Sequence, residues 1–168
     1  MTASALFQQM PPVFASVIFA AVREAERDFY QNTLPPLATD RKHRPVFVQR
    51  KPLDAQFPWL QNTLKLRTSN AIGEHLLQIW LLASHSEMLV QFLDTLGVEH
   101  DGEGAVDNLP EALDANKLKT AIDELLARHP QPHVWLYLHL FQMQRPGGWG
   151  ELAEVLDKVE RLATCGES

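Results

Sequence analysis

Three polar residues in an otherwise apolar stretch have side chains suited to acid–base chemistry. Glu74, Gln78 and His85 are separated by four and seven residues. On one continuous helix, at about 100° per residue, they would fall within roughly 40° of one another. A carboxylate and an imidazole so placed can serve as acid and base, or bind a polar ligand. The same spacing also fits a buried structural network or the exposed strip of a helix.

The other groups of reactive residues do not match known sites. Residues 99–103 (Glu-His-Asp-Gly-Glu) are rich in ligand atoms but miss the oxygen and glycine positions of a calcium loop. His129 and His133 are separated by prolines that prevent a helical two-histidine zinc pair. Cys165 has no evident base beside it. We therefore expect no metal and no cofactor, and catalysis is the less favoured interpretation.

Residues 35–59 form a proline-rich basic segment, which the sequence predicts to be an extended arm. Five prolines in it argue against a long helix, and residues 46–48 (Val-Phe-Val) would suit a short strand. Cations and aromatic residues together are typical of binding surfaces. The candidate partner-binding residues are Arg41, Lys42, Arg44, Phe47, Arg50, Lys51 and Trp59.

Charge is divided unequally along the chain. Residues 1–70 hold nine Lys and Arg against five Asp and Glu, whereas residues 71–168 hold six against sixteen. The arm is thus complementary to the acidic half of this chain or of a second copy. A solvated loop and a nucleic-acid contact are the alternatives, and the overall charge of −6 argues against nucleic acid.

The apolar spacing predicts an all-α protein. Helices are expected over residues 12–34, 71–96, 115–128 and 134–144, with a last one after residue 148. Residues 76–83 are apolar almost all round, which favours helix 71–96 as the centre of a five- to six-helix bundle. The length of 168 residues predicts a single domain over residues 1–168, with the 35–59 arm within it.

The sequence predicts neither secretion nor a membrane span. Residues 13–22 are apolar but about half as long as a bilayer requires, and no basic residue precedes them. A single cysteine cannot form an intrachain disulfide. We expect a cytoplasmic protein.

One resemblance covers about the C-terminal half. Residues 92–104 with Leu109-Pro110, Lys117-Leu118, Ala121-Ile122 and Tyr137-Leu138 resemble a group of uncharacterised bacterial all-helical proteins. That group has no known activity, so the resemblance implies a bacterial, cytoplasmic protein and assigns no residue a role.

Together these observations favour a non-catalytic interaction or scaffold protein that self-associates, most simply as a homodimer. An enzyme or small-ligand-binding protein using Glu74, Gln78 and His85 is the second interpretation. A nucleic-acid-associated protein acting through the arm is the third.

Overall fold

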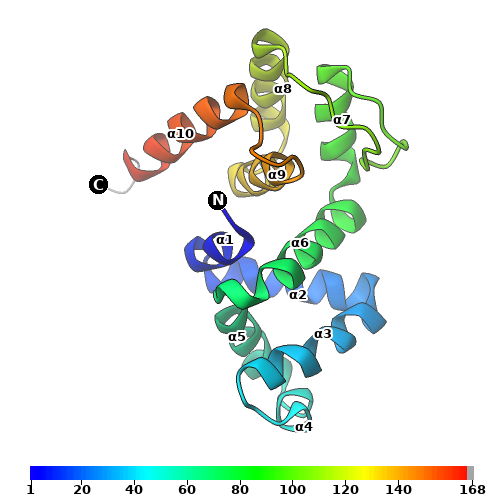
Figure 1. Cartoon of the computed structure of the whole chain (residues 1–168), viewed down its shortest axis with the longest axis vertical. Coiled ribbons are helices and arrows are strands. Elements are labelled where there is room, and N and C mark those ends of the chain that lie inside the picture. The colour runs from blue at the N-terminus through cyan, green and yellow to red at the C-terminus, as the bar shows by residue number, and fades with distance from the viewer. Residues whose placement is uncertain (166–168) are drawn as a thin grey trace. The chain divides into compact units, whose positions relative to one another are not determined.

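The computed structural model describes the backbone of residues 1–165 and the side chains of residues 1–158. Over this part the chain is all-α, as predicted: it contains ten α-helices and no strand. It divides into two compact units, residues 1–84 and 85–168 (Figure 1). The expectation of a single domain stays a prediction.

Unit 1 is built around its second helix. Its elements are α1 (Ala3–Gln9), α2 (Pro12–Ala25), α3 (Arg27–Asp40), α4 (Pro45–Gln49), α5 (Leu53–Leu64), a 3₁₀ turn (Arg67–Ser69) and α6 (Asn70–Ser84). Helix α2 packs against α3, α5 and α6. Phe19 on α2 is fully buried, with its ring 5.9 Å from that of Phe7 and 5.8 Å from that of Phe57. The centre of this unit is therefore α2, not the predicted helix 71–96.

In unit 2, each helix packs against its neighbours in sequence. Its elements are α7 (Ser86–Leu96), α8 (Ala115–Arg128), α9 (Gln131–Met143) and α10 (Gly150–Cys165). Helix α8 packs against α7 and α9, and α9 packs against α10. An aromatic cluster fills the interior: the Phe92 ring lies 5.2 Å from Tyr137 and 5.3 Å from Phe141, which stacks on Trp149 at 4.8 Å.

The predicted helix 71–96 is wrong in its middle, because the helix breaks at His85. Helix α6 ends at Ser84, His85 has φ −135° and ψ 28°, and α7 starts at Ser86. Serine hydroxyls compete for backbone hydrogen bonds, so the Ser-His-Ser sequence is a weak point in a helix. The predicted end of this helix at residue 96 is confirmed: Gly97 follows with φ 74°, and the Val98 N–H donates to the Leu93 carbonyl at 2.9 Å.

The expectation of an extended arm over residues 35–59 differs from the structure, which is mostly helical there. Helix α3 runs through Pro35 and Pro36 to Asp40. Its buried stripe continues beyond them at Leu37 and Ala38, both fully buried, and burial of this stripe favours the helix despite the two prolines. Residues 46–48, expected as a strand, belong to helix α4.

The last three helices agree with the prediction, whereas the first does not. Helix α8 spans Ala115–Arg128 as predicted, and α9 and α10 fall where the last two helices were expected. The first predicted helix, 12–34, is split at Glu26 into α2 and α3.

Within the described residues, no single helix is both long and apolar enough to cross a membrane. Residues 67–84 and 86–96 meet the length and composition requirements only when taken together across their bend.

Candidate interaction site

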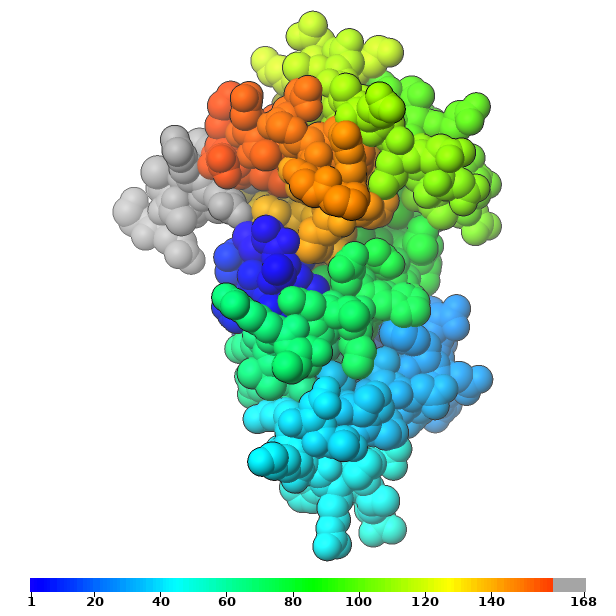
Figure 2. All heavy atoms as spheres, in the orientation of Figure 1, coloured from blue at the N-terminus to red at the C-terminus, as the bar shows by residue number. Residues whose placement is uncertain are grey.

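Exposed apolar side chains gather where α4 joins α3 to α5. Val46, Phe47 and Leu53 leave 53%, 57% and 40% of their surfaces exposed. Figure 2 shows this segment of unit 1 in cyan, with side chains projecting from the surface. Together with four neighbouring cations they make what we call the basic cap: Lys42, Arg44, Val46, Phe47, Arg50, Lys51 and Leu53. Apolar side chains edged by charge are typical of binding surfaces.

A strained turn leads into the basic cap. Helix α3 ends in a Schellman motif, in which the His43 N–H donates to the Ala38 carbonyl at 2.8 Å and the Lys42 N–H to that of Thr39 at 2.9 Å. Lys42 occupies the position that normally holds glycine, with φ 57°, and no other non-glycine residue has a positive φ in the part of the chain that the structure describes. Pro45 then starts α4 at a position where proline is favoured.

A buried polar relay attaches α4 to the core. Val48 is fully buried, and its carbonyl accepts a hydrogen bond from Gln56 Nε2 at 3.0 Å. The hydroxyl of Tyr30 donates to Gln56 Oε1 at 2.5 Å. Burial raises the pKa of Tyr30 above its ordinary range, so the hydroxyl stays protonated and remains a donor. The relay fixes the backbone on which Val46 and Phe47 are exposed.

Two of the predicted partner-binding residues support the basic cap from beneath. Trp59 is 9% exposed and donates its indole N–H to His43 Nδ1 at 3.1 Å. The Arg41 guanidinium lies 6.0 Å from the Trp59 ring centre and donates to Thr63 Oγ1 at 3.1 Å. Both residues thus have partners within unit 1, and Trp59 is buried, whereas 57% of the Phe47 surface is exposed.

The charge of the basic cap is uncompensated locally. Residues 41–53 contain five Lys and Arg and no Asp or Glu, and Asp40 and Asp54 flank them. Among the described side chains, the one basic nitrogen within 4 Å of a carboxylate oxygen is His100 Nε2, beside Asp94, so the cap cations have no carboxylate partner at that distance. The Lys51 ammonium instead lies 4.2 Å from the centre of the Phe47 ring.

The structure does not bring Glu74, Gln78 and His85 onto one helix. Glu74 and Gln78 are half-buried on α6, where Gln78 Nε2 donates to Glu74 Oε1 over a long 3.5 Å. His85 is the N-cap residue of α7 and belongs to unit 2. The predicted strip depended on helical periodicity across residues 78–85, which the break after Ser84 removes.

His85 belongs instead to a group of histidines. Its ring centre lies 4.6 Å from that of His133, and His129 Nε2 lies 3.1 Å from Gln91 Oε1. Burial, followed by the proximity of His133 and His129, lowers the pKa of His85 to about 4. Burial, followed by the proximity of His129, also lowers the pKa of His133. The rings of His85 and His133 are therefore neutral near pH 7.

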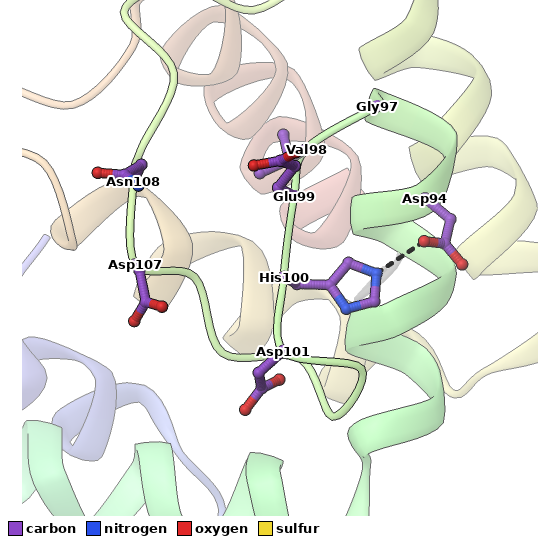
Figure 3. Close-up of a pocket in the computed structure, with 8 residues that line it drawn as sticks. All are labelled: Asp94, Gly97, Val98, Glu99, His100, Asp101, Asp107 and Asn108. Atoms are coloured by element: carbon purple, nitrogen blue, oxygen red, sulfur yellow. Dashed lines mark hydrogen bonds and ion pairs between the residues drawn. The ribbon is translucent and has the colours of Figure 1, made fainter.

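A pocket of about 490 Å³ opens beside the C-terminal end of α7 (Figure 3). Carboxylates dominate its lining, which consists of Asp94, Gly97, Val98, Glu99, His100, Asp101, Asp107 and Asn108. From the sequence, residues 99–103 predict no calcium loop, and nothing in them indicates that the loop returns to α7. We call this the acidic pocket.

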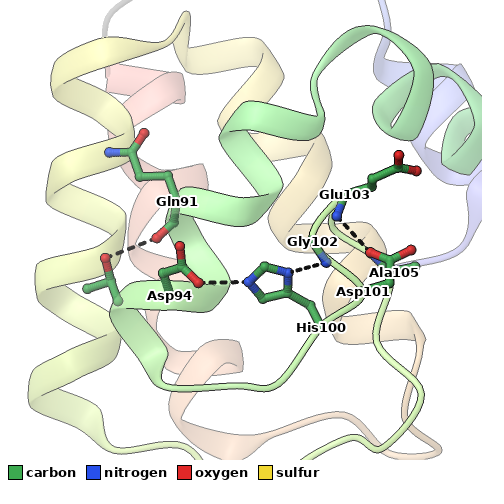
Figure 4. Close-up of polar contacts among 8 residues, drawn as sticks. Gln91, Asp94, His100, Asp101, Gly102, Glu103 and Ala105 are labelled. Carbon is green, nitrogen blue, oxygen red and sulfur yellow. Dashed lines mark hydrogen bonds and ion pairs between the residues drawn. The ribbon is translucent and has the colours of Figure 1, made fainter.

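Hydrogen bonds fix the acidic pocket in place (Figure 4). His100 Nδ1 accepts the Gly102 N–H at 3.0 Å, so Nε2 carries the proton that is donated to Asp94 Oδ1 at 2.7 Å. Asp101 Oδ1 accepts the N–H groups of Glu103 and Ala105. The Glu103 and Ala105 N–H groups hold the pKa of Asp101 below its usual range, so this carboxylate is ionised.

The pocket does not have the form of a metal centre. Among the described residues, no group of three or more His, Cys, Asp or Glu side chains is arranged to hold a metal ion. Cys165 lies outside the residues whose side chains the structure describes.

Sequence reasoning missed two members of the basic cap, Val46 and Leu53, and one residue that supports it, His43. Val46 and Leu53 were not chosen because the expected extended arm gave no basis for deciding which apolar residues face solvent. His43 was missed because a histidine sixteen residues before a tryptophan forms no recognisable sequence pattern.

No protein-family model, curated protein or solved structure matches this chain. The resemblance of the C-terminal half to bacterial helical proteins therefore stays a prediction.

Proposed function

We propose that this chain is a non-catalytic interaction protein that self-associates through the basic cap. The observation that carries the proposal is the exposure of Val46, Phe47 and Leu53 among cations that have no carboxylate within 4 Å among the described side chains. Fully burying a side chain such as Phe47 contributes about 1.5–3 kcal/mol. Covering the apolar part of the cap is therefore favourable for any partner whose charge complements it.

A second copy of the chain has the required charge. Residues 85–168 hold fifteen Asp and Glu against six Lys and Arg, a net charge of −9, whereas residues 1–84 hold six against nine, a net +3. Complementary charge guides encounter and sets register, while the apolar contact supplies most of the affinity.

The preorganisation of the basic cap also supports the proposal. The Tyr30–Gln56–Val48 relay holds α4, and Trp59 supports the turn through His43. A surface that is ordered before binding loses less entropy when its partner docks. The positive φ of Lys42 points the same way, since strain of this kind is concentrated at functional sites.

Two valines with nearly equal exposure test the proposal. Val46 is 53% exposed in the basic cap, and Val17 is 54% exposed on α2. We expect sedimentation equilibrium to show that Val46→Ser weakens the dimer, whereas Val17→Ser leaves the dimer unchanged. Equal effects of the two changes, or none from Val46→Ser, would contradict a role for the cap.

Separate binding assays test the other classes of partner. Tight retention of the wild type on a DNA or RNA oligonucleotide near 150 mM salt, lost on reversing the cap charges, would replace self-association with nucleic-acid binding. Binding to vesicles of anionic lipid, with no change in protein mass, would replace it with membrane-surface binding.

A further inference from the structure

We infer that the basic cap of one copy docks on the acidic pocket of a second copy. This assignment rests on the proposed self-association and adds the surface that receives the cap. It thereby gives the pocket a ligand: the guanidinium and ammonium groups of Arg44, Arg50 and Lys51.

The acidic pocket has the charge to receive cations. Asp94, Glu99, Asp101 and Asp107 line it, and His100 is held there by its hydrogen bond to Asp94. The C-terminal end of α7 contributes further negative potential, because the carbonyl dipoles of a helix point toward that end. The ammonium of Lys117 lies about 4.0 Å from where a Cβ on Gly97 would stand.

The pocket is also held rigidly enough to present those charges. A Cβ on Gly104 would lie 2.6 Å from the Leu89 Cβ, so the loop approaches α7 as closely as glycine allows. Asp101 closes the loop through its two backbone N–H partners, and His100 joins it to α7 through Asp94. The cap, likewise, is fixed by its relay.

The contact joins two unlike surfaces, and this determines the experiment. If the cap of each copy meets the pocket of the other, reversing the charge on either surface disrupts the contact. Reversing both surfaces restores it, whether they are on the same chain or on two different chains.

The cap-reversed variant is Arg44→Glu with Arg50→Glu, and the pocket-reversed variant is Glu99→Lys with Asp107→Lys. These four side chains are exposed and make none of the hydrogen bonds described above. Each variant alone is expected to weaken self-association at least about tenfold at low salt. An equimolar mixture of the two, or one chain carrying all four changes, is expected to regain wild-type mass by sedimentation.

A second lysine pair provides the control. Asp123→Lys with Glu154→Lys alters the net charge of unit 2 equally, at exposed positions that do not line the pocket. Mixing this variant with the cap-reversed one is expected to give no recovery. Thermal unfolding of each variant alone verifies that its fold is intact.

The outcomes separate the two proposals. If the cap-reversed variant and Val46→Ser dissociate the dimer but the pocket-reversed variant gives no recovery, or the control pair recovers equally well, the pocket is not the receptor and self-association through the cap still holds. If changes in the cap leave the wild-type mass unaffected, self-association through the cap fails first and this assignment fails with it.

Discussion

The ammonium of Lys51 lies 4.2 Å from the centre of the Phe47 ring, although 57% of the Phe47 surface is exposed. The contact joins the charged and apolar parts of the basic cap in a single arrangement. A cation over an exposed ring contributes only about 0.5–1 kcal/mol. It therefore orients Phe47 without covering it, and leaves the ring available to a partner.

Replacing Lys42 with glycine should separate stability from association. Glycine adopts the positive φ of this position without strain, so Lys42→Gly is expected to raise the free energy of unfolding by about 1 kcal/mol. The change also removes a cap cation and should weaken self-association. Urea unfolding and sedimentation measure the two effects.

The control is Arg44→Gly, which removes a neighbouring cation at a residue with φ −73°. It relieves no strain and should not stabilise the protein. A Lys42→Gly protein that is less stable than the wild type would show that the turn is not strained.

The relay beneath the cap predicts a stability cost at Gln56. Gln56→Leu removes the acceptor of the Tyr30 hydroxyl and the donor to the Val48 carbonyl, and both groups are buried. A buried polar group without a partner costs about 1–3 kcal/mol, measurable by urea unfolding. Adding Tyr30→Phe should then cost less than it does in the wild type, because its partner is already gone. Strict additivity of the two changes would contradict the relay.

Some helices could be predicted from the sequence alone, and others could not. The heptad-like spacing of Leu118, Ile122 and Leu125 is enough to define α8, because an amphipathic surface helix follows its own pattern. The continuation of α3 through Pro35 and Pro36 depends on burial of Leu37 and Ala38 against the rest of unit 1, which local proline rules do not include.

The candidate site was predictable in part for the same reason. The cations and Phe47 could be identified from composition alone, because charge is written directly in the sequence. The burial of Trp59 and the return of the 98–108 loop to α7 depend on contacts between distant residues. The polar strip failed because it assumed a helix that ends at Ser84.

Unit 2 should lose stability in mild acid. Burial lowers the pKa of His139 to about 4, and His85 has a similarly lowered value, against about 6.5 in an unfolded chain. Between these pH values the unfolded chain binds more protons than the folded chain. The free energy of unfolding therefore has its full value above about pH 7 and falls as the pH decreases toward 4.

The slope approaches about 1.4 kcal/mol per pH unit for each such histidine, and urea unfolding at pH 7.5, 6 and 5 measures it. His139→Leu should reduce the slope, because leucine does not titrate in either the folded or the unfolded state. His139 is 4% exposed, so the leucine occupies a buried position. Stability that rises between pH 7 and 5 would contradict the prediction.

The mass of the wild-type protein in solution tests self-association most directly. Light scattering at low micromolar concentration and low salt is expected to give about twice the 19.0 kDa of one chain, with dissociation as salt is raised. A mass of one chain at every concentration up to about 100 µM would mean a Kd weaker than roughly 0.1 mM. That result would contradict self-association.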